Sequence, residues 1–326
     1  MKAAIRDTYG PPSVVRVEDV PRPEPVRDQV LVRVEAASVN RADLDNLYPR
    51  WKFLRLFLGV RAPRDRGIGS DVAGVVESVG PDATRFKAGD RVFGDLFPFG
   101  GGAFAEYVVV PEKGIGLIGD AISFEDAATL PHAAVLALQG LRLRRNRRVK
   151  AGDKVMVVGA SGNVGPFAVQ IAKHRGAEVT GVASPSKLDF LRSMGADHVV
   201  DYNTQDPRAT GGTYDWIVDV DAHYSILSWR KSLKPDGVYV ALGGEASWFL
   251  KTLIQQPAVS LASGRSMGLM TWWKAFNPED VEELKRLVAS GAVKPQIDRR
   301  FSLDEAAEAL RYVDEGHARG KVLVIP

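Results

Sequence analysis

The stretch Lys154–Gly165, KVMVVGASGNVG, couples an apolar run to three evenly spaced glycines. Residues 154–158 predict a buried strand, and Gly159, Gly162 and Gly165 precede an apolar helical pattern. Glycine permits a tight strand-to-helix turn, where backbone amides can approach a pyrophosphate at the positive end of the helix. The stretch is therefore typical of the dinucleotide-binding turn of a Rossmann unit.

Composition narrows the possible chemistry. The chain has 326 residues, which suggests about two domains, and 45% of them are hydrophobic. Cysteine is absent, which excludes disulfides, thiolate nucleophiles and thiolate metal sites. The net charge of +3 is typical of an ordinary solvated surface rather than of a dedicated nucleic-acid binder.

The N-terminal residues lack the apolar core of a signal peptide, and no apolar run reaches the length of about 18 residues that a membrane span needs. We therefore expect a soluble cytoplasmic protein.

Short apolar runs separated by proline and glycine fill the first third of the chain. They predict strands over 14–17, 29–37, 70–79, 91–94 and 105–110. This pattern of short strands separated by turns indicates an irregular, mostly antiparallel barrel.

From residue 124 onward, strand and helix patterns alternate. Ser123 is placed to cap a first helix, and Pro131 precedes a second one through Leu143. Strand patterns cover 154–158, 178–182, 198–201, 214–220, 238–242 and 321–325, and helical patterns cover 164–175, 186–193, 224–232, 279–290 and 302–316. Such alternation predicts an α/β domain with a parallel sheet and helices on both faces.

Several motifs together resemble one family. They are GSDVAGVVESVG (69–80), FKAGDRVFG (86–94), GGAFAEYVVVP (101–111), the segment 151–165, GAD (195–197), LGG (242–244) and GKVLVIP (320–326). Their order and spacing resemble the medium-chain dehydrogenase/reductase superfamily, closest to its zinc-independent quinone oxidoreductase (zeta-crystallin-like) branch.

The resemblance implies an α/β protein of two domains, a β-barrel and a doubly wound parallel-sheet domain. A GroES-like β-barrel catalytic domain would comprise residues 1–121 and be completed by 291–326, and a Rossmann NADP-binding domain would comprise 122–290. It also implies a homodimer formed through the edge of the nucleotide-binding sheet, near residues 260–272.

The zinc alcohol dehydrogenases of this superfamily carry metal ligands at positions that match Asn40, Ser70 and the vicinity of His132 in this chain. One imidazole with an amide and a hydroxyl is a poor site for zinc, which takes about four ligands, usually nitrogen or thiolate. The four-cysteine lobe of those enzymes is missing too. We therefore expect no metal.

The resemblance and the glycine turn together predict the nucleotide-binding residues. They are Gly159, Ser161, Gly162, Asn163, Val164, Gly165, Ser184, Lys187, Tyr202, Leu242 and Gly243. NAD-specific units end their second strand on a carboxylate, whereas strand 178–182 here runs into Ala183 and Ser184. Because Ser184 and Lys187 offer donors to a 2′-phosphate, NADPH is favoured over NADH; a solvated helix residue is the alternative for Lys187.

Three residues are candidates for the acceptor side. Asn40 matches an asparagine of the family's nicotinamide and substrate pocket, and its amide would hold the acceptor oxygen. Tyr48 and His132 are candidate proton donors, with a structural hydrogen bond as the alternative for His132. Asp43 either belongs to the same motif or caps a helix.

Two further segments stand out. Residues 48–67 are aromatic and basic and would form an apolar lid, a membrane-surface helix or packing against the barrel. Residues 141–150, LRLRRNRRVK, are interpreted as a solvated face, which leaves nucleic acid as an unlikely partner.

The resulting hypothesis is a metal-free NADPH-dependent reductase that transfers hydride to a quinone or an α,β-unsaturated carbonyl. The alternatives are an enoyl-thioester or carbonyl/alcohol oxidoreductase of the same superfamily, and a non-catalytic protein that senses NADPH or binds RNA.

Overall fold

The structure, a computed structural model, describes residues 1–49, 59–143, 147–244 and 246–326. Its contacts divide the chain into two units. The first unit comprises Met1–Val135, Ala275–Ala289 and Pro295–Pro326, and the second comprises Leu136–Lys274 and Ser290–Lys294. This division places residues 122–135 and Ala275–Ala289 with the first unit, whereas the sequence placed them in the nucleotide-binding domain. Contacts do not define domain boundaries by themselves, and the limits at residues 121 and 290 stay predictions.

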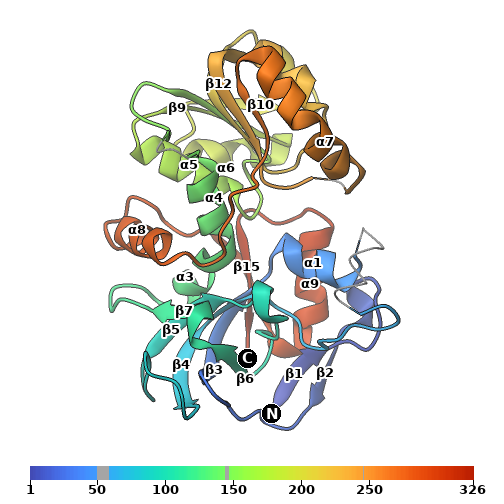
Figure 1. The fold of residues 1–326 in the computed structure, drawn as a ribbon, viewed down its shortest axis with the longest axis vertical. Helices are drawn as coiled ribbons and strands as arrows, with labels where there is room; N and C mark the ends of the chain where they lie inside the picture. The colour runs from blue at the N-terminus through green and yellow to red at the C-terminus, as the bar shows by residue number, and fades with distance from the viewer. Residues whose placement is uncertain (50–58, 144–146, 245) are drawn as a thin grey trace. The chain divides into compact units, whose positions relative to one another are not determined.

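The first unit is built on a seven-stranded sheet that brings the two ends of the chain together. In order it contains β14 (Ile297–Ser302), β15 (Lys321–Ile325), β3 (Gln29–Ser38), β4 (Asp71–Val79), β5 (Arg91–Asp95) and β7 (Ile115–Leu117), and β6 (Tyr107–Pro111) also pairs with β3. All pairs are antiparallel except β14 with β15. Figure 1 shows the red strand β15 among the blue and cyan strands of the N-terminal region.

Smaller elements complete this unit. A separate antiparallel pair is formed by β1 (Lys2–Ile5) and β2 (Arg16–Asp19). The α-helices in the described part of this unit are α1 (Arg41–Leu47), α3 (Phe124–Ala128), α8 (Pro278–Ala289) and α9 (Ala306–Asp314). Ser123 caps α3 as predicted, because its Oγ accepts the Asp126 N–H at 3.0 Å.

Side chains of β3 point alternately to the two faces of the sheet, and one of these faces forms the core of the first unit. Val30, Val32 and Val34 are buried on one face, where they pack with residues of β4 and with Val322 and Val324 of β15. The C-terminal strand is thus part of the barrel core, as the resemblance predicted.

The second unit contains a six-stranded parallel sheet. Its order is β10 (His198–Asp201), β9 (Glu178–Ala183), β8 (Lys154–Val158), β11 (Tyr214–Asp219), β12 (Leu233–Ala241) and β13 (Ser266–Leu269). Its helices are α5 (Gly165–His174), α6 (Leu188–Ser193) and α7 (Ala246–Ser263), and Leu136–Gly140 of α4 (Val135–Gly140) also belongs to it. The strand order reverses beside β8, the arrangement of a doubly wound sheet that binds ligands at the carboxyl ends of its strands.

Three of the predicted strands, 154–158, 198–201 and 321–325, have the predicted bounds. The helix predicted through Leu143 was wrong in its form, because residues Leu130–Ala134 make a π-helical turn and α4 ends at Gly140. The segment 224–232 was predicted as an ordinary helix, but Ile226–Ser232 is a 3-10 helix. Helix α7 and strands β7, β13 and β14 were not predicted, and α1 was suggested only as a helix that Asp43 caps.

The outer edge of β13 is already covered by α7. Ser260 Oγ bonds the N–H and the carbonyl of Met267, at 3.1 and 3.0 Å, and Gln256 Oε1 accepts the N–H of Leu269 at 2.9 Å. A second copy of the chain can therefore pair with these groups only by displacing α7 side chains.

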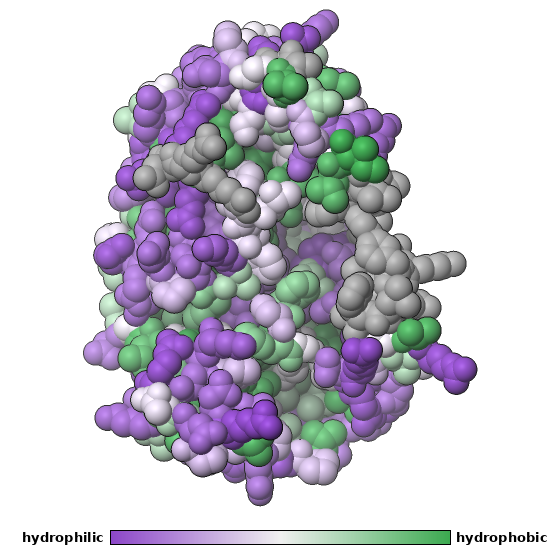
Figure 2. Space-filling model, viewed as in Figure 1, coloured by the Kyte–Doolittle hydropathy of each residue, from purple (hydrophilic) through white to green (hydrophobic). Residues whose placement is uncertain are grey.

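Hydrophilic residues cover most of the face drawn in Figure 2, and apolar residues appear there in scattered groups. Within the described ranges, no helix combines the length and apolar character that crossing a membrane requires.

Candidate active site and nucleotide turn

A buried polar cluster lies where several strands of the first unit begin or end. Its members are Ser38, Asn40, Asp43, Ser70, Asp71, Asp95, His132 and Lys321, all of which are buried. The strand register explains the gathering, because Ser38 of β3 pairs with Asp71 of β4, and Asp71 pairs with Asp95 of β5. Residue Leu323 of β15 pairs with Ser38, which brings Lys321 to the same place.

Lys321 and Asp71 form the centre of this cluster. The Lys321 ammonium donates to Asn40 Oδ1 at 2.7 Å, to Asp71 Oδ2 at 3.2 Å and to the Val39 carbonyl at 3.4 Å. The same Asp71 oxygen accepts Asn40 Nδ2 and Ser38 Oγ, each at 2.8 Å. Both charged side chains have no solvent exposure.

These bonds fix the orientation of the Asn40 amide. A lysine ammonium only donates and a carboxylate only accepts, so Oδ1 must face Lys321 and Nδ2 must face Asp71. One N–H of Nδ2 is used on Asp71. The second N–H is the only side-chain donor that Asn40 can offer to another group.

Burial dominates the electrostatics of the pair. It raises the pKa of Asp71 and lowers the pKa of Lys321, because each charged form loses its hydration. The charge of each partner opposes the shift of the other. Such a pair is held by its geometry and its additional hydrogen bonds as much as by attraction.

His132 joins the cluster through both its backbone and its ring. Its N–H donates to Asp71 Oδ1 at 3.0 Å, and its Nδ1 lies 2.9 Å from Asp95 Oδ2. Burial alone would lower the pKa of His132, but the charge and hydrogen bond of Asp95 and the charge of Asp71 outweigh it, so the pKa is raised.

Asp43 stabilises the N-terminus of α1. Its carboxylate accepts the Asn40 N–H at 2.7 Å and a hydrogen bond from the Ser70 hydroxyl. The cap itself is Asn40, and Asp43, the third residue of the helix, completes a capping box with it. Burial raises the pKa of Asp43 to about 6.

Tyr48 lies at the end of α1, and no hydrogen bond among the described residues joins it to the cluster. Its hydroxyl instead donates to the carboxylate of Asp314, the last residue of α9. Burial and this hydrogen bond raise the pKa of Tyr48 to about 12. The structure thus brings Asn40 and His132 together and leaves Tyr48 outside the cluster.

The glycine turn of the second unit has the conformation that its spacing predicted. Gly159 has φ of 72°, in the left-handed region that glycine favours. A Cβ at Gly165 would lie 2.3 Å from the carbonyl carbon and oxygen of Ala160, so only glycine permits this contact. A Cβ at Gly162 would meet only the Gly159 oxygen, at 3.7 Å, which leaves open space beside the backbone for a phosphate.

The other predicted nucleotide-binding residues lie at the carboxyl ends of the parallel strands. Ser184 and Lys187 follow β9, and the N–H of Tyr202 bonds the carbonyl of Ala183 at 3.3 Å. Beyond β12, the Leu242 N–H bonds the Asp219 carbonyl at 2.8 Å, and the Gly243 carbonyl accepts from Ala222 at 3.3 Å. This is the end of the sheet at which doubly wound folds bind ligands.

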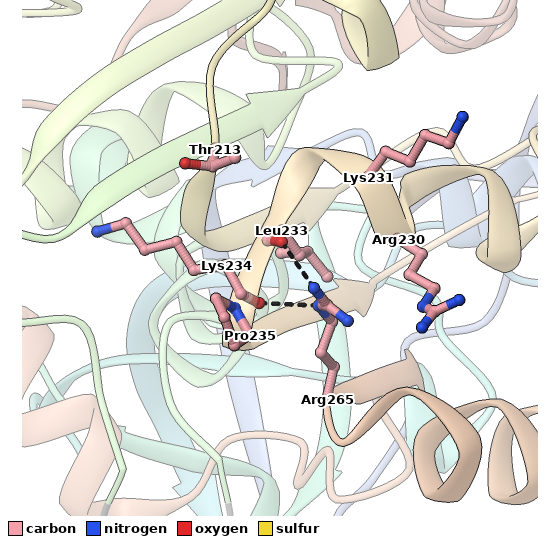
Figure 3. A pocket seen from close by; sticks show the side chains of 7 residues that line it. All are labelled: Thr213, Arg230, Lys231, Leu233, Lys234, Pro235 and Arg265. Atoms are coloured by element: carbon pink, nitrogen blue, oxygen red, sulfur yellow. Dashed lines mark hydrogen bonds between the residues drawn. The ribbon is translucent and has the colours of Figure 1, made fainter.

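A basic hollow of about 420 Å³ lies at the opposite end of β12 and β13 (Figure 3). Thr213, Arg230, Lys231, Leu233, Lys234, Pro235 and Arg265 line it. Its cations do not converge: Lys231 and Lys234 extend in opposite directions, and Arg265 donates to the carbonyls of Lys234 and Leu233 at 2.8 and 3.2 Å. The hollow therefore lacks the arrangement of an anion site.

Parts of two predicted segments lie outside the described residues. They include Arg50, Trp51, Phe53, Leu54, Arg55, Phe57 and Leu58 of the lid segment, and residues 144–146 of the basic run. Elsewhere in the basic run, Arg147 lies 4.0 Å from Asp236, an exposed ion pair that agrees with a solvated face.

Sequence reasoning missed Ser38, Asp71, Asp95 and Lys321 as members of the cluster. A signal was present, because Asp71, Asp95 and Lys321 each stand at the first or last position of an apolar strand. A lysine directly before the apolar run VLVI needs a partner for its charge once the strand is buried.

Comparisons with known proteins agree with this architecture. A family described as "Alcohol dehydrogenase GroES-like domain" matches residues 26–120, and one described as "Zinc-binding dehydrogenase" matches residues 194–324. The "Structure of the quinone oxidoreductase from Coxiella burnetii" aligns with a TM-score of 0.86 and 31% identity, over 100% of this chain and 99% of that one.

Curated relatives carry similar names. The chloroplast envelope quinone oxidoreductase homolog of Arabidopsis thaliana is 32% identical over 94% of this chain and 92% of its own length. The NADPH-dependent alkenal/one oxidoreductase of the same plant is 32% identical over 100% of this chain and 80% of its own length.

The fold and these comparisons define an oxidoreductase of a family that binds nicotinamide dinucleotides and acts on small molecules. The chain belongs to the medium-chain dehydrogenase/reductase superfamily, in its quinone oxidoreductase branch. The predicted fold class, a GroES-like barrel with a parallel Rossmann sheet, is confirmed.

Proposed function

We propose that this chain is a metal-free reductase that uses NADPH to reduce a quinone or an α,β-unsaturated carbonyl compound. The observation that carries the proposal is the Asn40 amide, held between Asp71 and Lys321 so that it presents only an N–H. Reduction of either acceptor class builds negative charge on an oxygen, and a fixed donor stabilises that charge. The names of two relatives, a quinone oxidoreductase homolog and an NADPH-dependent alkenal/one oxidoreductase, support the same reaction.

The glycine turn and the ends of β9, β10 and β12 fit a nicotinamide nucleotide. Gly159, Gly162 and the first turn of α5 would hold the pyrophosphate, and Leu242 and Gly243 would line the nicotinamide side. A bound NADPH supplies the hydride. The protein then has to orient the acceptor, donate to its oxygen and deliver one proton.

The residues at the matching metal positions do not fit zinc. Asn40 Oδ1 already accepts from the Lys321 ammonium at 2.7 Å, and a second cation there would be repelled. The Ser70 hydroxyl donates to Asp43, and His132 Nδ1 lies 2.9 Å from Asp95. This donor set supports catalysis in which hydrogen bonds replace a Lewis acid.

His132 is favoured over Tyr48 as the proton donor. The Tyr48 hydroxyl donates to Asp314, and a pKa of about 12 makes it a weak acid at neutral pH. The raised pKa of His132 instead keeps more of its imidazole protonated near neutral pH.

The test is turnover of NADPH with an acceptor panel: phenanthrenequinone, a simple enone, an alkenal, an enoyl thioester and a ketone. We expect oxidation of NADPH with the quinone, the enone or the alkenal. Turnover only with the thioester or the ketone would favour the other oxidoreductases of the superfamily. No turnover with any acceptor would overturn the proposed function.

We expect Lys187→Ala to weaken NADPH binding about tenfold and to leave NADH binding unchanged, because only NADPH carries the 2′-phosphate that Lys187 would pair with. Titration of the protein with each nucleotide measures this. Lys231→Ala, an exposed lysine at the opposite end of the sheet, is the matched control. Equal losses for both nucleotides would refute the assignment of Lys187.

We also propose a homodimer and a cytoplasmic location, as the sequence led us to expect. Since α7 covers the edge of β13, pairing would use the outer surface of α7, where Ile254 and Leu261 are 71% and 87% exposed, rather than the strand edge. Light scattering and sedimentation of the purified chain test the oligomeric state.

A further inference from the structure

Asp95 is a buried carboxylate directly beside the His132 ring. It ends β5 and has no solvent exposure. Its Oδ1 accepts the Phe97 N–H at 2.8 Å, and its Oδ2 lies 2.9 Å from His132 Nδ1. Because a carboxylate only accepts, the proton of this second bond resides on Nδ1. Asp95 thereby fixes both the plane and the tautomer of the ring.

The backbone around His132 also helps to fix the position of its side chain. Residues Leu130–Ala134 form a π-helical turn, a feature that occurs frequently at functional sites. Within it, the His132 N–H donates to Asp71 Oδ1 at 3.0 Å. Two carboxylates from neighbouring strands therefore position one imidazole, through its backbone and its ring.

The two members of the pair differ in their access to a ligand. The Asp95 side chain is 0% exposed, whereas the His132 side chain is 11% exposed. A bound acceptor can therefore exchange a proton with the His132 ring but not directly with Asp95. Asp95 affects that exchange only through its hydrogen bond to the ring.

The charges around the ring come from four elements. Asp95, Asp71 and Asp43 are acidic, on β5, β4 and α1, and Lys321 on β15 is basic. Asp43 is neutral below a pKa of about 6. Near neutral pH, the charges of Asp71 and Lys321 offset each other, and Asp95 is the direct partner of an imidazolium.

We propose that Asp95 is a positioning residue that holds His132 as the proton donor of the reduction. This inference rests on the proposed function. The reduction adds one hydride, supplied by the bound nucleotide, and one proton to the acceptor. The N–H bond of the His132 imidazolium breaks, its proton bonds to the acceptor, and the neutral imidazole takes its next proton from water.

The test compares the pH dependence of kcat/KM in the wild type, Asp95→Asn and His132→Gln. For the wild type we expect kcat/KM to fall as pH rises through the pKa of His132. Asp95→Asn should shift this fall to lower pH by about one unit, because the carboxylate that stabilises the imidazolium is gone. His132→Gln should lower kcat/KM about a hundredfold and remove the fall.

The exposed pair His198 and Glu178, whose Nε2 and Oε1 atoms lie 3.0 Å apart, provides matched controls. His198→Gln and Glu178→Gln should leave the profile unchanged. Active Asp95→Asn and His132→Gln variants with the wild-type profile would overturn the role of the pair while leaving the proposed function intact. A wild type that turns over no acceptor would instead overturn the proposed function and, with it, a catalytic role for the pair.

A second measurement does not depend on activity or on the folding of Asp95→Asn. The imidazole signals of the wild type can be titrated by NMR, and His132→Gln identifies the signal of His132 among the five histidines. We expect its pKa to lie above the ordinary value of 6.5. A His132 that titrates at or below that value would overturn the proposal.

Discussion

Replacing Lys321 by methionine is expected to lower the free energy of unfolding of the first unit by about 3–5 kcal/mol. Methionine keeps most of the volume of the side chain but removes its charge. Asp71, which has no solvent exposure, then remains as a buried carboxylate without its counter-charge. The hydrogen bonds that Asp71 accepts from Ser38, Asn40 and the His132 N–H come from neutral groups and supply no counter-charge for the buried carboxylate.

Hydrogen exchange of the amides in β3, β4 and β15 measures this effect in the unit concerned. Lys2→Met is the control, because Lys2 pairs with Asp304 at 3.1 Å on an exposed surface and should contribute less than about 1 kcal/mol. The double variant Lys321→Met with Asp71→Asn should recover more than half of the loss, since no unpaired charge remains. Equal stability of Lys321→Met and the wild type would contradict the prediction.

The same variant should show a characteristic dependence on pH. Without Lys321 the pKa of Asp71 rises further above its usual value, so the folded state binds a proton more readily than the unfolded state. Stability relative to the wild type is then lowest at neutral and higher pH, and it improves as pH falls and Asp71 is protonated. A loss that stays constant between pH 5 and pH 8 would indicate that charge is not its cause.

The local parts of the fold could be predicted from the sequence. Gly159 and Gly165 form a turn between a strand and a helix that adjoin in the chain, so spacing alone defines it. Periodicity defined β8, β10 and β15 for the same reason. The form of the segment around His132 was not predictable in this way, because its backbone N–H donates to a side chain that is distant in the sequence, Asp71 of β4.

The partners of the site residues depend on long-range register. Asn40 was identified by its motif, but its partner Lys321 lies 281 residues away in the sequence. Tyr48 was predicted as a candidate proton donor, yet its hydroxyl donates to Asp314, 266 residues away. A motif identifies which residues carry chemistry, and the pairing of β3, β4 and β15 determines what each one touches.

Replacing Asn40 by alanine is expected to lower kcat and kcat/KM together by about a hundredfold to a thousandfold. The reason is the direction of its amide. With Oδ1 on Lys321 and one N–H on Asp71, the second N–H is a preoriented donor, and both neighbours polarise it. Its bond to the acceptor oxygen strengthens as negative charge builds there, which stabilises the transition state more than the bound acceptor.

A purely structural role for Asn40 makes a different prediction, and the two can be separated. Asn46→Ala on the same helix is the matched control, and it should retain activity. Asn40→Ala should bind NADPH normally, because the nucleotide turn belongs to the second unit. Lys321→Arg keeps a cation on Oδ1 and should preserve more activity than Lys321→Met. If Asn40→Ala instead raised KM with kcat unchanged, Asn40 would bind the acceptor without stabilising the transition state. If the variant kept full activity, the fixed N–H would have no role in the reduction.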